Sequence, residues 1–165
     1  MLSGEEPTVQ SYIRSGLTGA VAGGLATVPM TAFMLLAHRK GFLGEEPPRL
    51  ITDFALISAG LPIHNKNAET AVSGSVHFGF GIVCGALFGT ISRRARLPFS
   101  RVIGGMLYGL LVWLVSYHGW IPALHIMPPP EEDRPGRPAV MILAHLIYGS
   151  ALGWIVERAD TSPSR

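Results

Sequence analysis

Two histidines of this chain stand at the head of the same short pattern. Residues 75–89 read SVHFGFGIVCGALFG and residues 144–153 read AHLIYGSALG, so each copy follows His-x-x-(Phe or Tyr)-Gly-x-x-x-Gly. An imidazole ring can donate or accept a hydrogen bond, ligate a metal, or change its charge near neutral pH. His77 and His145 are therefore the first candidates for chemistry in this sequence.

Three interpretations of these two histidines stay open. Neutral imidazoles can hydrogen-bond across helices, to Tyr117, Ser116 or Ser73, and so fix the register of packed helices. Two imidazoles can also bind a transition metal together with loop carboxylates, or ligate haem b from both sides. Protonation sensing is the third interpretation. We expect no cofactor, and we keep haem b or a transition metal at His77 and His145 as the alternative.

The candidate residues are predicted to gather at one end of the molecule. His77 and His145 each lie about 10 Å from the start of an apolar segment, at the 1.5 Å rise of a helical residue. His118 and Tyr117 lie near the end of another segment that runs the opposite way. The predicted ligand or hydrogen-bond cluster is therefore His77, His118, His145 and Tyr117. All six histidines of the sequence fall on this side.

The composition indicates a membrane protein. Only 15% of the 165 residues are charged, against about 25% in a typical soluble domain. The mean hydropathy is +0.35, and 20 residues are glycine. The single cysteine, Cys84, excludes an intrachain disulfide and a cysteine-rich metal motif. Basic residues do not alternate with aromatic ones, so we expect no nucleic-acid partner.

Four apolar segments approach the length of about 20 residues that a membrane-spanning helix needs. The sequence therefore predicts an all-α membrane protein, a four-transmembrane-helix bundle that forms a single membrane domain over residues 1–165. The predicted spans are residues 15–37, 70–91, 102–121 and 139–156. They are joined by outer loops at 38–69 and 122–138 and by a cytoplasmic loop at 92–101.

Glycines repeat at intervals of four along these segments, which places them on one ridge of each helix. Small residues let helix backbones approach closely, where van der Waals packing replaces the hydrophobic drive that lipid lacks. The repeated pattern also suggests two related helical hairpins. The predicted packing glycines are Gly19, Gly23, Gly81, Gly85, Gly89, Gly105, Gly109, Gly149 and Gly153.

Arginines set the expected orientation. Arg93, Arg94, Arg96 and Arg101 fall in one short connection, and short cationic loops stay in the cytoplasm. Both termini should then be cytoplasmic too.

The longer loop at 38–69 also carries cations, but it mixes them with carboxylates. Its apolar residues recur at helical spacing. That spacing predicts a short helix on the membrane interface. The apolar residues of this helix are Leu50, Phe54, Ile57 and Leu61.

Several pieces together resemble the YagU-like family of uncharacterised bacterial inner-membrane proteins. The pieces are HFGFGIVCGALFG, RRARLPFSR, GGMLYGLLVWLVSYH, PPP at 128–130 and AHLIYGSALGW, over about residues 73–158. The resemblance implies a multi-pass protein of the bacterial inner membrane. It also implies a loose association with acid tolerance and no established activity. His77, His118 and His145 look like positions shared with that family.

The expected function is that of a small non-enzymatic membrane protein. It would act as an accessory subunit or as a component related to pH or acid stress. Its partners would be the lipid bilayer, other membrane-protein subunits or a second copy of this chain. The alternatives are a histidine-ligated metal or haem b redox module, and a transporter built as an oligomer. The pattern identifies no catalytic residues.

Overall fold

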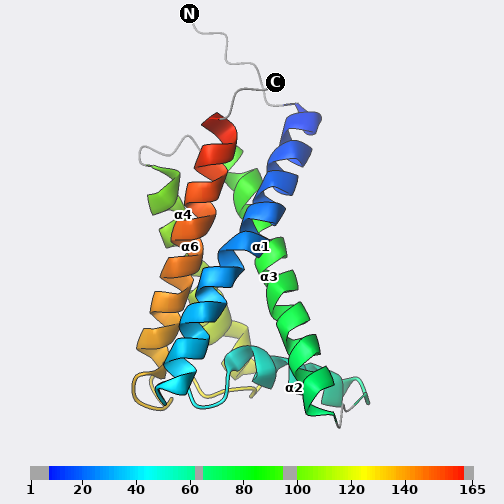
Figure 1. Cartoon of the computed structure of the whole chain (residues 1–165), viewed down its shortest axis with the longest axis vertical. Helices are drawn as coiled ribbons and strands as arrows, with labels where there is room; N and C mark the ends of the chain where they lie inside the picture. Colours follow the sequence, from blue (N-terminus) through cyan, green and yellow to red (C-terminus); the bar gives the residue numbers. More distant parts are fainter. Residues whose placement is uncertain (1–7, 62–64, 95–99, 162–165) are drawn as a thin grey trace, which may run out of the picture.

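Four long helices run side by side, with a shorter helix across one end (Figure 1). The computed structural model describes residues 8–61, 65–94 and 100–161, and within these residues every regular element is helical. The predicted fold class is confirmed. The elements are α1 (Val9–Arg39), α2 (Pro47–Ser58), α3 (Lys66–Arg94), α4 (Arg101–Trp113), η1 (Leu114–Trp120), α5 (Ile121–Ala123) and α6 (Arg137–Thr161).

The long helices correspond to the four predicted spans. Each is long and apolar enough to cross a membrane, and the third combines α4, η1 and α5 into one span. All four extend beyond the apolar segments, because helical hydrogen bonding continues into the polar flanks. At the start of α1, for example, the Thr8 hydroxyl accepts a hydrogen bond from the Ser11 N–H at 3.3 Å. Such a bond satisfies an N–H that the helix itself cannot pair.

The spans pack as two hairpins, α1 with α3 and α4 with α6. Between the hairpins, α1 packs along α6, whereas α3 and α4 touch only sparingly. Helices α3 and α6, which carry the two copies of the histidine pattern, run in the same direction (Figure 1). The hairpins predicted from the repeated pattern are therefore present, and their symmetry is broken where α3 faces α4.

Glycines form the contact within the first hairpin. A Cβ atom added to Gly85 would lie 2.6 Å from the Cα of Gly23, and one added to Gly19 would lie 2.9 Å from the Cα of Gly89. Both separations are shorter than real Cβ contacts allow. Only glycine permits these two backbones to approach so closely.

The second hairpin repeats this arrangement. A Cβ atom on Gly149 would lie 2.7 Å from the carbonyl carbon of Gly105, and one on Gly153 would lie 2.8 Å from the Cα of Val102. The backbones of α4 and α6 therefore touch in the same manner as those of α1 and α3. The ridges predicted from the spacing of the glycines are the contact surfaces within both pairs.

Two tyrosines connect the second hairpin to α3. The Tyr148 hydroxyl donates to the carbonyl oxygen of Gly81 at 2.7 Å, and the Tyr108 hydroxyl donates to that of Cys84 at 2.8 Å. A carbonyl oxygen has two lone pairs, so each can accept this bond without losing its helical one. These bonds fix α3 against the second hairpin near the middle of the bundle.

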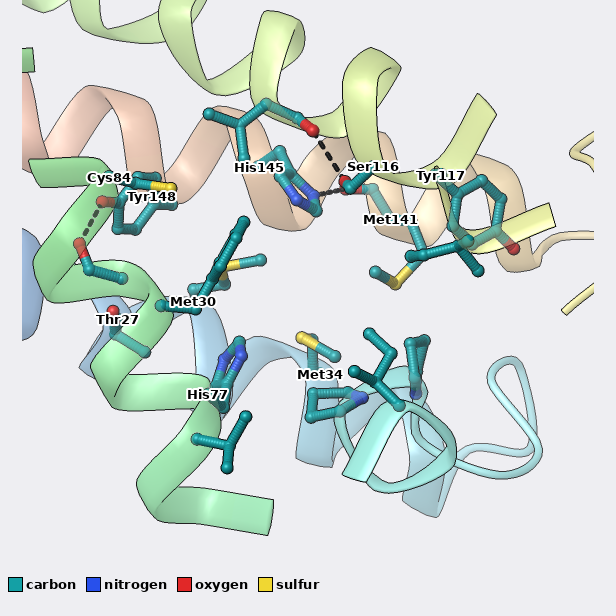
Figure 2. Close-up of a pocket in the computed structure, with 18 of the residues that line it drawn as sticks. Thr27, Met30, Met34, His77, Cys84, Ser116, Tyr117, Met141, His145 and Tyr148 are labelled. Atoms are coloured by element: carbon teal, nitrogen blue, oxygen red, sulfur yellow. Dashed lines mark hydrogen bonds between the residues drawn. The ribbon is translucent and has the colours of Figure 1, made fainter. Parts of the chain in front are cut away.

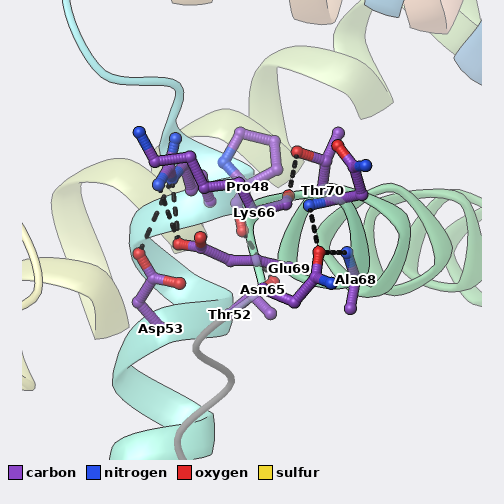
Figure 3. A network of polar contacts seen from close by, with 10 residues as sticks. Pro48, Thr52, Asp53, Asn65, Lys66, Ala68, Glu69 and Thr70 are labelled. Carbon is purple, nitrogen blue, oxygen red and sulfur yellow. Dashed lines mark hydrogen bonds and ion pairs between the residues drawn. The ribbon is translucent and has the colours of Figure 1, made fainter.

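Helix α2 crosses the end of the bundle at which α3 and α6 begin (Figure 1). Arg49 ties it to α3 through Glu69, at 2.9 Å, and lies 3.9 Å from Asp53 (Figure 3). Leu50 packs against the core, whereas Ile57 is 69% exposed. A helix in this loop was predicted correctly, and its place on a membrane interface stays a prediction.

Replacing Gly85 by alanine should destabilise the bundle, because the added methyl group meets the backbone of Gly23. Overpacking of this kind typically costs about 1–3 kcal/mol. Gly79→Ala is the matched control on the same helix, since nothing lies within 4 Å of its Cβ position. In thermal unfolding of detergent-solubilised protein, Gly85→Ala should melt below wild type and Gly79→Ala should not. Equal midpoints would show that the glycine contact does not hold the helices together.

Candidate functional site

A cavity of about 110 Å³, partly open to the outside of the bundle, lies between α3 and η1 (Figure 2). His77 of α3 and His145 of α6 both line it, and Figure 2 shows them on different walls. Most other lining side chains are apolar, among them Met30, Met34 and Met141. The cavity therefore combines an apolar interior with two imidazole rings.

The cavity follows from the way the hairpins are joined. Glycine contacts hold each hairpin tightly, but between hairpins α3 and α4 touch only sparingly. The tyrosine bonds from Tyr108 and Tyr148 join them near the middle of the bundle. Towards the α2 end the two hairpins leave a space, and Pro47, Pro48 and Ile51 of α2 contribute to its wall.

A π-helical segment forms part of the opposite wall. Within η1, the buried side chains of Ser116 and Tyr117 line the cavity. The ring of Tyr117 stacks on that of Trp113, with centroids 6.1 Å apart and an angle of 24° between the planes. The sequence predicts an unbroken helix here, and the structure corrects it. Short π segments are rare and occur frequently at functional sites.

His145 is held in a fixed orientation. Its side chain is 7% exposed, and Nδ1 lies 2.8 Å from the carbonyl oxygen of Met141. A carbonyl oxygen only accepts, so Nδ1 carries the proton and donates it to this bond. In the neutral ring, Nε2 is then left as an acceptor. His145 therefore offers one lone pair from a rigid ring.

His77 differs from His145 in its hydrogen bonding. Its Nε2 atom is buried and has no hydrogen-bond partner in the described part of the chain. Buried polar atoms nearly always have a partner, which is water or a ligand where the protein supplies none. Among the residues that line the cavity, His77 thus supplies the buried side-chain nitrogen that is left for a water or a ligand.

The other predicted residues are divided between this cavity and the surface. Tyr117 lines the cavity with the two histidines, but His118 does not. Its Nε2 lies 2.7 Å from a carboxylate oxygen of Glu131, and its side chain is 45% exposed. Two hydrogen bonds lower the pKa of the Glu131 carboxyl group. The larger effect comes from the backbone N–H of Glu131 itself, and the smaller one from His118.

The predicted orientation residues lie at the other end of the bundle. Arg93 and Arg94 are in the last turn of α3, and Arg101 begins α4 and pairs with Asp160 at 2.7 Å. Arg96 lies outside the described residues.

The shape of the bundle limits what the histidines can hold. Among the described residues, no three His, Cys, Asp or Glu side chains are grouped as metal ligands. The glycine ridges are filled by the backbones of the facing helices, so they leave no slot for a flat macrocycle. The cavity has room for a small molecule, and haem at His77 and His145 stays an untested alternative.

A buried ion pair beside the cavity was not foreseen. The side chains of Asp133 and Arg137 are 3% and 11% exposed and lie 3.0 Å apart. The Tyr117 hydroxyl donates a hydrogen bond to the Asp133 carboxylate. Arg137 Nε donates a hydrogen bond to the carbonyl oxygen of Leu43 at 2.7 Å. The pair thus joins the start of α6 to η1 and to the α1–α2 connection. The spacing of four residues is visible in the sequence, but it lies in a proline-rich, charged stretch that is typical of an exposed loop.

Comparison with known proteins gives a family and no activity. The sequence model of the Family of unknown function (DUF6789) matches residues 13–165, and the chain belongs to that family. No curated protein and no solved structure matches the chain. The match includes all four spans almost completely. The matched family does not carry the YagU-like name, so that resemblance stays a prediction.

Asp133→Asn should destabilise the protein strongly, because it leaves the buried Arg137 guanidinium without a counter-charge. Removing one partner of a buried pair typically costs about 3–5 kcal/mol. Glu132→Gln, at the exposed neighbouring position, should change stability by no more than about 0.5 kcal/mol. Denaturant unfolding in detergent micelles measures both. If the two variants unfolded at the same denaturant concentration, Asp133 would not be the residue that balances Arg137.

Proposed function

We propose that this member of a family of unknown function is a non-enzymatic membrane protein that binds a small, mainly apolar molecule beside His77 and His145. The observation that carries the proposal is an apolar cavity whose wall contains a buried ring nitrogen without a protein partner. An accessory or acid-stress-related role in a bacterial inner membrane, as the sequence resemblance implies, is compatible with such binding.

The volume of the cavity limits its ligand. At about 30 Å³ for each water molecule in the liquid, 110 Å³ corresponds to roughly three to four waters. Apolar cavities tend to stay dry and to accept apolar atoms. The buried part of the ligand is then a short hydrocarbon group. One polar group of the ligand, attached to that hydrocarbon, can reach His77.

The hydroxyl groups around the cavity favour binding over catalysis. Nucleophilic catalysis needs a hydroxyl or thiol within reach of a base. Here Ser116 donates to the carbonyl of Val112 at 2.6 Å, and Thr27 donates to that of Gly23 at 2.8 Å. Tyr117 and Tyr148 also donate to other groups. None of these hydroxyls is directed at an imidazole.

The outer surface of the bundle supports lipid as a partner. Leu17, Val21 and Val28 are more than half exposed along α1, which is the helix that packs against both α3 and α6. Exposed apolar rows of this kind face lipid or another membrane-embedded chain. We therefore propose the bilayer as the surrounding medium, with a second copy or another subunit as the further possibility for this face.

The cavity should bind n-butanol in a saturable way. Equilibrium dialysis of the detergent-solubilised protein against radiolabelled n-butanol, with excess unlabelled alcohol as competitor, separates this binding from partition into micelles. Cys84→Phe fills the cavity and should abolish the saturable part. Val83→Phe introduces the same ring at the neighbouring position. Val83 is 58% exposed, so this variant should leave binding unchanged. Wild-type protein without saturable uptake would refute the proposed function.

We also propose that both termini lie in the cytoplasm. The start of α1, the end of α6 and residues Arg93 and Arg101 share one end of the bundle (Figure 1), and arginine-rich short connections stay inside. In a Cys84→Ala background, an impermeant maleimide added to intact cells should label Glu132→Cys and spare Ala159→Cys. Both positions are exposed. The reverse pattern of labelling would invert the proposed orientation.

A further inference from the structure

A second hollow meets the apolar cavity at His77. This recess, of about 480 Å³, lies between α1, α2 and α3 at the α2 end of the bundle. Met34, Pro48 and His77 line both the recess and the cavity. The two spaces are therefore neighbours that share one wall, and the imidazole of His77 belongs to both.

The inner part of the recess contains polar atoms that lack partners. Thr31 Oγ1 and His77 Nε2 are both buried and have no hydrogen-bond partner among the described residues. Ser73, which is also buried, lines the same space. Groups of this kind require a water or a ligand that can donate hydrogen bonds to them. The recess thus has polar groups next to His77, whereas the cavity beyond it is apolar.

The charges around the recess favour a cation. Glu45 and Glu46 line it, and neither forms a salt bridge within the described residues. Arg49 is the cation of the same wall, but Glu69 and Asp53 already balance its charge (Figure 3). The two glutamates therefore add negative charge to this end, which repels anions and attracts cations, although the Arg134 guanidinium lies beside the neighbouring Gly44.

We propose that the recess and the cavity form one binding site for a small amphiphilic cation, an alkylammonium with a short apolar chain. The ammonium group occupies the recess near Glu45 and Glu46, and the chain passes His77 into the apolar cavity. This inference rests on the proposed function and names the class of its ligand.

Each half of such a ligand matches the space that it occupies. An ammonium group has three N–H donors and no acceptor. Thr31 Oγ1 is an acceptor that the protein leaves unused, and so is His77 Nε2 when the ring carries its proton on Nδ1. Moving the same charge into the cavity would cost free energy, because its wall is mainly apolar and carries no carboxylate. The position of the charge thus fixes the direction in which the ligand lies.

Three probes of similar length and different charge test the inference on the full-length protein in detergent micelles. They are n-butylamine, which is protonated at pH 7 as a lysine side chain is, n-butanol, and butyrate. Equilibrium dialysis should show that n-butylamine binds more tightly than n-butanol by about tenfold, the scale of one hydrogen bond to a charged group. Butyrate should show no saturable binding, because its charge has the wrong sign for the recess.

A pair of double variants locates the site of this preference. Glu45→Gln combined with Glu46→Gln should remove the advantage of n-butylamine and leave the affinity for n-butanol unchanged. Glu131→Gln combined with Glu132→Gln changes the net charge equally but does not touch the recess, so it should preserve the preference.

The possible outcomes separate this inference from the proposed function. If n-butanol and n-butylamine bind equally in wild type, or if both double variants lose the preference alike, the cation site is refuted and the apolar cavity stands. If none of the three probes binds saturably, both the cation site and the proposed function are refuted. Loss of the amine preference in the recess variant alone supports the assigned site.

Discussion

Direct contact between glycine backbones is the interaction on which the rest of this structure depends. In lipid, helices gain nothing from burying apolar side chains, so association depends on close van der Waals packing and on a few polar bonds. Gly23 with Gly85 in one hairpin, and Gly105 with Gly149 in the other, supply that packing. Where these glycines meet, the two backbones of a hairpin leave no space between them. The cavity lies between the hairpins, and the recess lies at the α2 end, beyond the glycine contact of α1 with α3.

The polar groups of the bundle divide into two classes. Most hydroxyls inside the spans, such as those of Thr90 and Ser150, donate to a carbonyl one helical turn back and so need no external partner. Thr31 Oγ1 and His77 Nε2 are buried and have no hydrogen-bond partner among the described residues. Natural proteins tend to break a structural rule where function requires it. These two atoms line the recess beside the cavity, whereas the third buried atom without a partner in the described part of the chain, Trp113 Nε1, lines neither space.

The sequence predicts the elements that depend on local composition and spacing. The four spans follow from the length of the apolar segments, and the helix contacts follow from glycines four residues apart.

Three features depend instead on contacts between distant segments. The π-helical turn at Tyr117 leaves the apolar pattern unchanged, so periodicity does not reveal it. Asp133 and Arg137 resemble loop charges until α1 and η1 enclose them. His118 lies next to Tyr117 in sequence but pairs with Glu131 outside the cavity, because consecutive side chains of a helix point in different directions.

The two copies of the histidine pattern differ in the aromatic residue before the first shared glycine, and that difference affects how the hairpins are joined. In the second copy, the Tyr148 hydroxyl reaches across to the Gly81 carbonyl of the first copy. The equivalent residue of the first copy is Phe80, which has no hydroxyl and so returns no bond to the second hairpin. Phe80 instead lines the cavity and is 44% exposed. The hydrogen bond between the two copies therefore runs in one direction, from α6 to α3, and the cavity beside it has a histidine from each copy on its walls.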